Sequence, residues 1–223
     1  MDIKNKSQFI EYFSKGAKSS NNLKIGVEHE RFLFEGQNKK RISYETLKKL
    51  FENLKVNGWE PLYEKGNIIG MQRNKQQITT EPGLQCELSG APLENIHQVC
   101  SESSKFLKEI ETASKSLDVN TVSIGFDPFN SLSDIPQSPK SRYKIMTKEM
   151  PKGGKQSLEM MYRTCGIQIN YDYTSEENFE KIFRLGNYLT PLTIALYSNS
   201  PFESGQPVGY YSYRNKVWQN TSR

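Results

Sequence analysis

The sequence predicts an α+β protein whose sheet is largely antiparallel. Stretches with apolar residues at helical spacing alternate with short stretches of strand character. The region 60–89 contains several short stretches of strand character in succession, which is typical of antiparallel hairpins. No segment repeats at a fixed period, so a solenoid is excluded. Interleaved helices and hairpins indicate a sheet flanked by helices.

Length and charge narrow the class of protein. The chain has 223 residues, so we expect one domain over 1–223. The net charge of +5 is spread along the chain, unlike the basic patch of a nucleic-acid-binding protein. The mean hydropathy of −0.72 and the lack of a long apolar run predict no membrane span. The N-terminal residues lack the apolar core of a secretory signal, which predicts a cytoplasmic protein.

The first half of the chain predicts three helices around one strand and the hairpin region. In order, these are a helix over 6–17, a strand over 24–34, a helix over 43–57, hairpins over 60–89 and a helix from Pro92 to about Leu117. Proline suits the first turn of a helix, which is why the third helix is expected to begin at Pro92. Its inward face is expected to carry Ile96, Val99, Phe106, Leu107 and Ile110.

The second half predicts two more strands and two more helices. In order, these are a strand over 121–126, a proline-containing loop over 127–140, a short helix over 141–150, a strand over 163–173 and a long, rather apolar helix over 175–199. An aromatic segment over 207–220 follows.

The densest candidate site is the pair Glu28 and Glu30 in the first strand. Residues i and i+2 of a strand point to the same face, so the two carboxylates project together. Like charges side by side repel each other unless a proton or a cation intervenes, and Mg²⁺ prefers such oxygen ligands. Such a pair is also common on the solvated face of an edge strand, and spacing alone favours that interpretation without excluding the metal site. His29 is expected on the opposite face, in or near the core.

A second candidate is the stretch from Glu81 to Glu87. Gln85 and Glu87 are expected to share a strand face, and Glu81 joins them if the intervening proline and glycine keep the register. The following turn leads into a helix whose N-terminus favours anions. An ordinary strand–turn–helix connection explains the same pattern.

A third candidate is the strand that begins at Arg163. Gln168 and Asn170 are expected to share a polar face, with Ile167 and Ile169 toward the core. If this strand neighbours the two glutamate-bearing strands, one sheet face carries many oxygen ligands. Such a face is what a polyphosphate and metal site needs. A solvent-exposed polar face without a ligand would show the same sequence pattern.

A fourth candidate is Arg214 with Trp218 in the aromatic segment. Four residues apart on a helix, they share a face. An arginine can hold a substrate carboxylate with two hydrogen bonds, and tryptophan can form a pocket wall. The competing interpretation is an arginine stacked on tryptophan at the surface.

At these residues the sequence resembles glutamate–cysteine ligase of the plant and proteobacterial type. The resemblance follows the family's order and covers nearly the whole chain. It is carried by IGVEHERFLF (25–34), TEPGLQCELSGAPLENIHQVCSE (80–102), SRYKIM (141–146) with MPK (150–152), MMYRTCGIQINYDYTSEENF (160–179) and NSPFESGQPVGYYSYRNKVWQNT (199–221).

The resemblance implies a fold like that of glutamine synthetase, with a curved antiparallel sheet holding ATP, Mg²⁺ and glutamate. The implied reaction phosphorylates the γ-carboxylate of L-glutamate with ATP, after which L-cysteine displaces phosphate. By resemblance, the metal ligands are Glu28, Glu30 and Glu87, with Glu81 as an addition. Arg163, Arg214 and Trp218 match positions that contact glutamate or the acyl phosphate, with both arginines catalytic. Gln168 and Asn170 match the nucleotide side.

Two departures from the family pattern matter. Cys86 replaces an aromatic or aliphatic residue, but it is expected on the opposite face from Glu87 and so to alter packing only. The family also continues beyond the point that matches 221–223, so the chain resembles its N-terminal half. A half-sheet is expected to end in an unpaired edge and to leave the apolar faces of the helix over 175–199 partly uncovered.

Three functions remain open. The first is glutamate–cysteine ligase itself, with small-molecule substrates, no nucleic-acid or membrane partner, and a homodimer as an assembly to test. The second is a related ATP-dependent carboxylate–amine ligase with another amine acceptor. The third is a fragment that binds Mg²⁺ and ATP without turnover.

Overall fold

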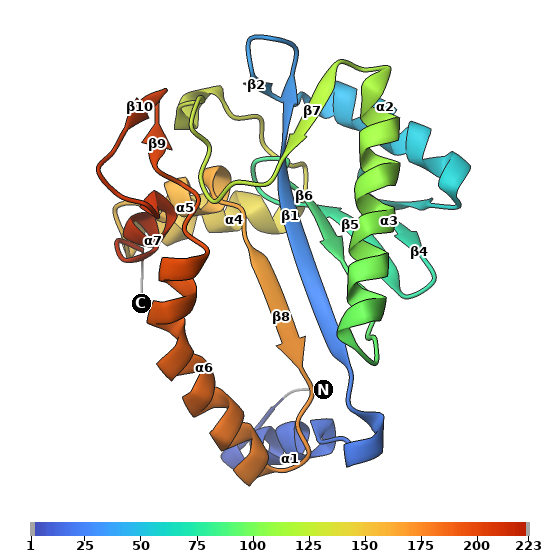
Figure 1. Cartoon of the computed structure of the whole chain (residues 1–223), viewed down its shortest axis with the longest axis vertical. Helices are drawn as coiled ribbons and strands as arrows, with labels where there is room; N and C mark the ends of the chain where they lie inside the picture. The colour runs from blue at the N-terminus through green and yellow to red at the C-terminus, as the bar shows by residue number, and fades with distance from the viewer. Residues whose placement is uncertain (1–2, 222–223) are drawn as a thin grey trace.

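The computed structural model describes residues 3–221, which form an antiparallel sheet flanked by helices (Figure 1). The sheet strands are β1 (Ile25–Glu35), β2 (Lys40–Arg41), β3 (Glu60–Glu64), β4 (Asn67–Arg73), β5 (Gln76–Thr80), β6 (Cys86–Ser89), β7 (Val119–Val122) and β8 (Ile167–Tyr171). The helices are α1 (Lys6–Gly16), α2 (Tyr44–Leu54), α3 (Ile96–Lys115), α4 (Ser141–Glu149), α5 (Ser157–Arg163), α6 (Glu176–Leu196) and α7 (Tyr213–Trp218). A separate small hairpin consists of β9 (Phe202–Glu203) and β10 (Gln206–Pro207). The predicted α+β class with an antiparallel sheet is confirmed.

The long strand β1 organises the sheet. The strand order is β2-β1-β6-β5-β4-β3, and β7 and β8 also pair with β1, all antiparallel. Residues 25–29 of β1 pair with β8, and residues 28–31 pair with β6. The stretch 28–29 is therefore flanked on both edges, with Glu28 inside this stretch and Glu30 directly after it.

The main core lies on the face of the sheet covered by α2 and α3. The apolar stripe of α2 is buried there, as its spacing predicts, and α3 adds Phe106 and Ile110. Leu33 of β1 and Cys86 and Leu88 of β6 face this core. Because side chains alternate along a strand, the even-numbered residues of β1 face the other way.

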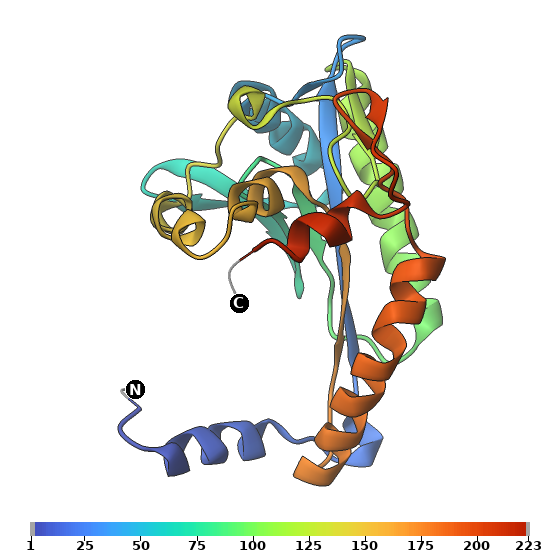
Figure 2. The ribbon, with the colours of Figure 1, turned by 90° about the vertical axis from the view of Figure 1, so that its left-hand side faces the viewer.

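The opposite face of the sheet carries helices from the second half of the chain. Figure 2 shows α3 on one side of β1, with α4, α5 and α7 on the other. The helices α5 and α7 contact each other, and α5 leads directly into β8. No helix within residues 3–221 is long and apolar enough to cross a membrane.

Several predicted boundaries were wrong. The third helix begins at Ile96, because the side chain of Asn95 accepts a hydrogen bond from the backbone N–H of Gln98 and caps it there. Ile96 is consequently exposed rather than inward. The strand predicted over 121–126 spans only Val119–Val122.

The segment predicted as a strand over 163–173 divides between two elements. Arg163 ends the helix α5, which was not predicted, and the strand β8 starts four residues later. Ile167 and Ile169 are exposed, contrary to the prediction that they face the core. The reason is that β8 lies outside the main core under α2 and α3, and every one of its residues is exposed.

Candidate functional site

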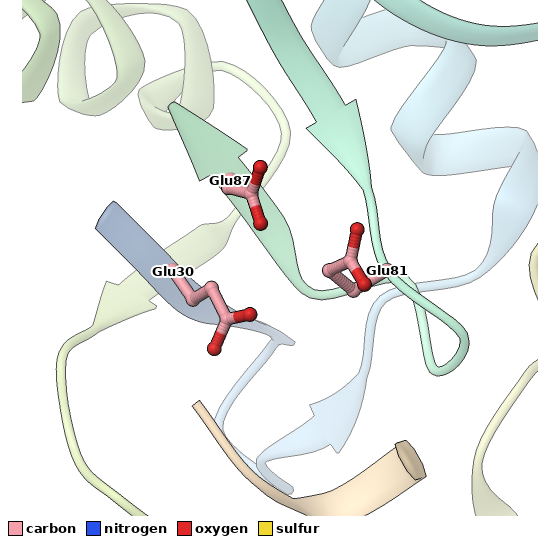
Figure 3. Close-up of side chains that lie close together, drawn as sticks. All are labelled: Glu30, Glu81 and Glu87. Atoms are coloured by element: carbon pink, nitrogen blue, oxygen red, sulfur yellow. The ribbon is translucent and has the colours of Figure 1, made fainter. Parts of the chain in front are cut away.

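Three glutamates meet on the sheet face opposite α3. Glu30 on β1 and Glu87 on β6 are register partners in neighbouring strands, so their side chains stand next to each other. Glu81 follows the end of β5 and turns toward this pair. One carboxylate oxygen from each residue lies within 4.8 Å of the others (Figure 3). Converging carboxylates are the hard oxygen donors that Mg²⁺ prefers, so this carboxylate group fits a divalent cation.

The turn that presents Glu81 is held by Gln85. The Gln85 amide donates hydrogen bonds to the carbonyls of Met161 (3.1 Å) and Thr164 (3.0 Å), and its oxygen accepts one from the N–H of Gly83 (2.8 Å). Gln85 is buried and directly precedes β6, and its side chain reaches α5 on the same side of the sheet as Glu87, opposite the core-facing Cys86. Its role is to join the turn to α5.

Arg41 is the second side chain that ties this turn to α5. Its guanidinium donates to the carbonyls of Gly83 and of Tyr162, the latter at 3.2 Å, and pairs with the fully buried Asp127 at 3.3 Å. A Cβ on Gly83 would lie 2.6 Å from the carbonyl oxygen of Tyr162, so this close approach requires glycine. The hydrogen bonds of Gln85 and Arg41 therefore form a buried polar network that fixes the turn carrying Glu81 against α5.

The carboxylates perturb each other's ionisation. Burial, followed by repulsion from Glu81 and Glu87, raises the pKa of Glu30 to about 7. Burial and repulsion from Glu87 also raise the pKa of Glu81. The charged side chain of Arg214 acts in the opposite direction on Glu30. At neutral pH Glu30 is therefore only partly ionised unless a cation joins the group.

Each carboxylate of the group is also oriented by a hydrogen bond. The donors are the N–H of Gly166 to Glu30 (2.5 Å), the hydroxyl of Ser89 to Glu87 (2.6 Å) and the hydroxyl of Tyr143 to Glu81 (3.2 Å). Because every carboxylate keeps a second oxygen for another partner, these bonds position the group and leave ligand capacity free.

Glu28 lies outside the three-carboxylate group. It shares the face of Glu30 but sits two residues away, where the amide of Asn170 donates a hydrogen bond to it at 2.9 Å. Gln168 is its register partner in β8. The expected proximity of Glu28 to Gln168 and Asn170 is confirmed. That Glu28 binds a metal, and that Gln168 and Asn170 bind the nucleotide, stays a prediction.

Arg214 lies beside the carboxylate group. A Cβ on Gly166 would lie 2.8 Å from Nη2 of Arg214, so the guanidinium rests on the same glycine whose N–H binds Glu30. The guanidinium carbon also lies 5.3 Å from the ring centroid of Trp218, over its face. Arg214 therefore stacks on Trp218, as the competing interpretation expects, and also lies close to the carboxylates, while its contact with a substrate carboxylate stays a prediction.

Arg163 is placed differently. It is 3% exposed and pairs with Glu159 (2.9 Å) and Glu203 (3.0 Å). Its guanidinium also lies 4.4 Å from the centroid of the Phe126 ring. The chain thus supplies two carboxylates to Arg163 in place of a substrate, and its predicted contact with glutamate stays a prediction.

Sequence reasoning missed a cationic group on α4. Lys140 and Arg142 flank Ser141 at the start of this helix, and Tyr143 follows. Arg142 lies 3.9 Å from the Glu81 carboxylate. The match of SRYKIM (141–146) to the family pattern included Arg142 and Tyr143 without giving them a role, and Lys140 lies just outside that match. His29 on the face opposite Glu30 and Cys86 in the core are both confirmed.

Comparison with known proteins gives a consistent result. The family described as glutamate-cysteine ligase family 2 (GCS2) matches residues 24–223. The chain is 41% identical over 217 residues to glutamate–cysteine ligase A, chloroplastic, of Oryza sativa subsp. japonica. It is 42% identical over 217 residues to the chloroplastic glutamate–cysteine ligase of Nicotiana tabacum, and 39% identical over 219 residues to that of Arabidopsis thaliana.

The match covers nearly all of this chain but less than half of each relative. It includes 97% of this chain and 44% of the rice protein, 97% and 42% for tobacco, and 98% and 42% for Arabidopsis. The chain therefore spans less than half the length of these relatives.

Proposed function

Because the chain belongs to glutamate-cysteine ligase family 2, we propose that it carries the metal- and glutamate-binding part of an ATP-dependent ligase. The proposed reaction joins the γ-carboxylate of L-glutamate to the amine of L-cysteine and gives γ-glutamylcysteine, the first step of glutathione biosynthesis. The observation that supports it best is the convergence of Glu30, Glu81 and Glu87 beside Arg214.

The metal proposed for the carboxylate group is Mg²⁺. Glu30, Glu81 and Glu87 would hold it, and their mutual repulsion favours a cation at this point. When bound, Mg²⁺ offsets the negative charge of the transferred phosphoryl group. Glu28 lies two residues along β1 and would act on the side of the nucleotide, with Gln168 and Asn170. Asn170 also lines an open pocket of about 260 Å³ with Gly26 and Gly90.

The proposed chemistry has two steps. A γ-carboxylate oxygen of glutamate attacks the γ-phosphorus of ATP, and ADP leaves. The uncharged amine of cysteine then attacks the acyl carbon of γ-glutamyl phosphate, phosphate leaves, and the amine loses a proton. A free carboxylate is a poor electrophile, so the first step provides the leaving group for the second.

Arg214 is the best-placed residue to orient glutamate. Its guanidinium can bind a carboxylate with two hydrogen bonds, and Trp218 would wall the pocket. A direct role for Arg163 would require a substrate carboxylate to displace Glu203 from it. Arg214 is favoured over Arg163 as the residue that binds glutamate, because within residues 3–221 Arg214 has no ion pair whereas Arg163 has two.

A binding part without turnover is the second candidate function. It is favoured by the exposure of β8 and α6, which leaves the site open on that side. The amine acceptor, a homodimer and a cytoplasmic location are further proposals. The names of the plant relatives place those proteins in the chloroplast, so location needs its own measurement.

Phosphate release tests the proposed function. The chain is incubated with MgATP and glutamate, with and without cysteine, and Glu30→Gln is compared with Glu60→Gln, an exposed glutamate on β3. We expect glutamate-dependent release that cysteine stimulates, lost in Glu30→Gln and kept in Glu60→Gln.

Other outcomes separate the alternatives. Binding of MgATP without release would identify a binding part that lacks turnover. Greater stimulation by another amino acid would replace cysteine as the acceptor. Equal behaviour of Glu30→Gln and the wild type would contradict the proposed metal site.

A further inference from the structure

Lys140 is a largely buried lysine near the carboxylate group, and its ammonium reaches solvent. The residue is 6% exposed, and within residues 3–221 its ammonium makes no hydrogen bond and no ion pair within 4.0 Å, although Nζ keeps access to solvent. Burial lowers the pKa of Lys140, while the charges of Glu81 and Glu87 raise it. Because this ammonium is accessible and has no carboxylate bound to it, an anion placed before it can accept a charge-assisted hydrogen bond.

The backbone around Lys140 is fixed against the turn that carries Glu81. On one side, the hydroxyl of Ser138 is hydrogen-bonded to that of Thr80 at 3.1 Å. On the other, the hydroxyl of Tyr143 donates to Glu81 at 3.2 Å. Lys140 lies between these two anchors, with its Nζ 5.6 Å from the centroid of the Tyr143 ring. The segment that carries Lys140 is therefore docked against this turn, and the charges of Glu81 and Glu87 act on its ammonium.

Arg142 adds a second, accessible cation at the rim. Its guanidinium donates to the Tyr143 hydroxyl at 2.8 Å and lies 3.9 Å from the Glu81 carboxylate, while 63% of its side chain is exposed. One buried and one exposed cation thus flank the same carboxylates. A metal held by carboxylates and flanked by cations is an arrangement that suits a metal-bound phosphate.

We propose that Lys140 binds an oxyanion of a phosphoryl group at the carboxylate group of Glu30, Glu81 and Glu87, with Arg142 as a rim contact. The inference rests on the proposed function for the presence of a metal at this site. The competing explanation is that Lys140 serves only as a countercharge that lowers the repulsion among the carboxylates.

Binding of inorganic tripolyphosphate in the presence of Mn²⁺ tests this inference without glutamate, cysteine or turnover. Lys140→Met removes the charge and keeps the length of the side chain, whereas Lys140→Arg keeps the charge. Lys144→Met, an exposed lysine on the same helix, is the matched control. Mn²⁺ affinity is measured separately by electron paramagnetic resonance, and tripolyphosphate affinity by calorimetry.

We expect Lys140→Met to weaken tripolyphosphate binding about tenfold or more, because a charge-assisted hydrogen bond is lost. Its Mn²⁺ affinity should be unchanged or higher, since a positive charge has left the site. Lys140→Arg should retain much of the binding, and Lys144→Met all of it.

Three results would overturn the inference. These are tripolyphosphate binding by Lys140→Met at the wild-type affinity, an equal loss of Mn²⁺ and tripolyphosphate affinity in that variant, or no tripolyphosphate binding by the wild type. Failure of the ligase proposal is a separate result. Lys140-dependent binding of tripolyphosphate by a chain that never releases phosphate would retain the anion site and reject the activity.

Discussion

At the scale of single residues, Glu30 determines the charge of the site at neutral pH. Its pKa is raised from the usual 4.5 to about 7, mainly by burial and then by Glu81 and Glu87. In the unfolded chain the same group ionises at its usual pKa. Ionising Glu30 in the metal-free protein therefore opposes folding over the interval between these two values.

The resulting prediction concerns stability in a metal chelator. The free energy of unfolding should fall as the pH rises from about 4.5 to about 7 and change little above that, by about 3 kcal/mol for a shift of this size. Glu81, whose pKa is also raised, acts in the same direction. Urea unfolding at a series of pH values measures the slope.

Glu30→Gln is the control for this pH dependence. The variant keeps an oxygen for the Gly166 N–H but has no charge, so its slope should be shallower and its stability at pH 8 higher than that of the wild type. Mn²⁺ should stabilise the wild type and not the variant. Equal slopes in the two proteins would show that Glu30 does not ionise in this interval.

At the scale of elements, the decisive contact joins the turn 81–85 to the C-terminal end of α5. Gln85 alone satisfies two carbonyls of the segment 161–164 and one N–H of the turn. The same segment leads to Gly166, which orients Glu30. Glu81 and Glu30 therefore share a support to which Gln85 contributes together with Arg41.

Replacing Gln85 by leucine should cost about 2–3 kcal/mol of unfolding free energy, because buried carbonyls lose their donors. Mn²⁺ affinity should fall as well, since Glu81 and Glu30 lose a common support. Gln72→Leu, at an exposed position on β4, provides the control and should change neither quantity. An unaltered Mn²⁺ affinity in a destabilised Gln85→Leu variant would show that the turn holds Glu81 by itself.

The same contact shows what sequence could and could not predict. Alternation along a strand correctly put Glu28 and Glu30 on one face, because the strand period is a local property. Proximity of Glu81 to Lys140, or of Gln85 to Met161, depends on how distant segments pack. Arg163 was placed in a strand because the short helix α5 has few turns and its boundary carries no side-chain cap.

At the scale of the whole molecule, β8 and α6 form an uncovered surface. Every residue of β8 is exposed, and no residue of α6 is buried. The exposed apolar side chains of α6 include Phe179, Phe183, Leu185, Tyr188, Leu189, Leu192 and Leu196. An apolar pocket of about 500 Å³ lies between α1 and the start of α6. The expectation of an open edge with an uncovered apolar helix is thus confirmed.

An exposed apolar surface of this extent should make the isolated chain self-associate. Sedimentation velocity should show a mass that increases with concentration, and a hydrophobic dye should bind. The pair Phe183→Glu and Leu192→Glu should reduce both effects without loss of stability, because neither side chain is buried. Asn187→Glu with Thr193→Glu adds the same charge at exposed polar positions of α6 and should leave association unchanged. If both pairs of substitutions reduced association equally, net charge rather than apolar contact would govern self-association. If the wild type were a monomer at every concentration, the exposed apolar face of α6 would not drive self-association.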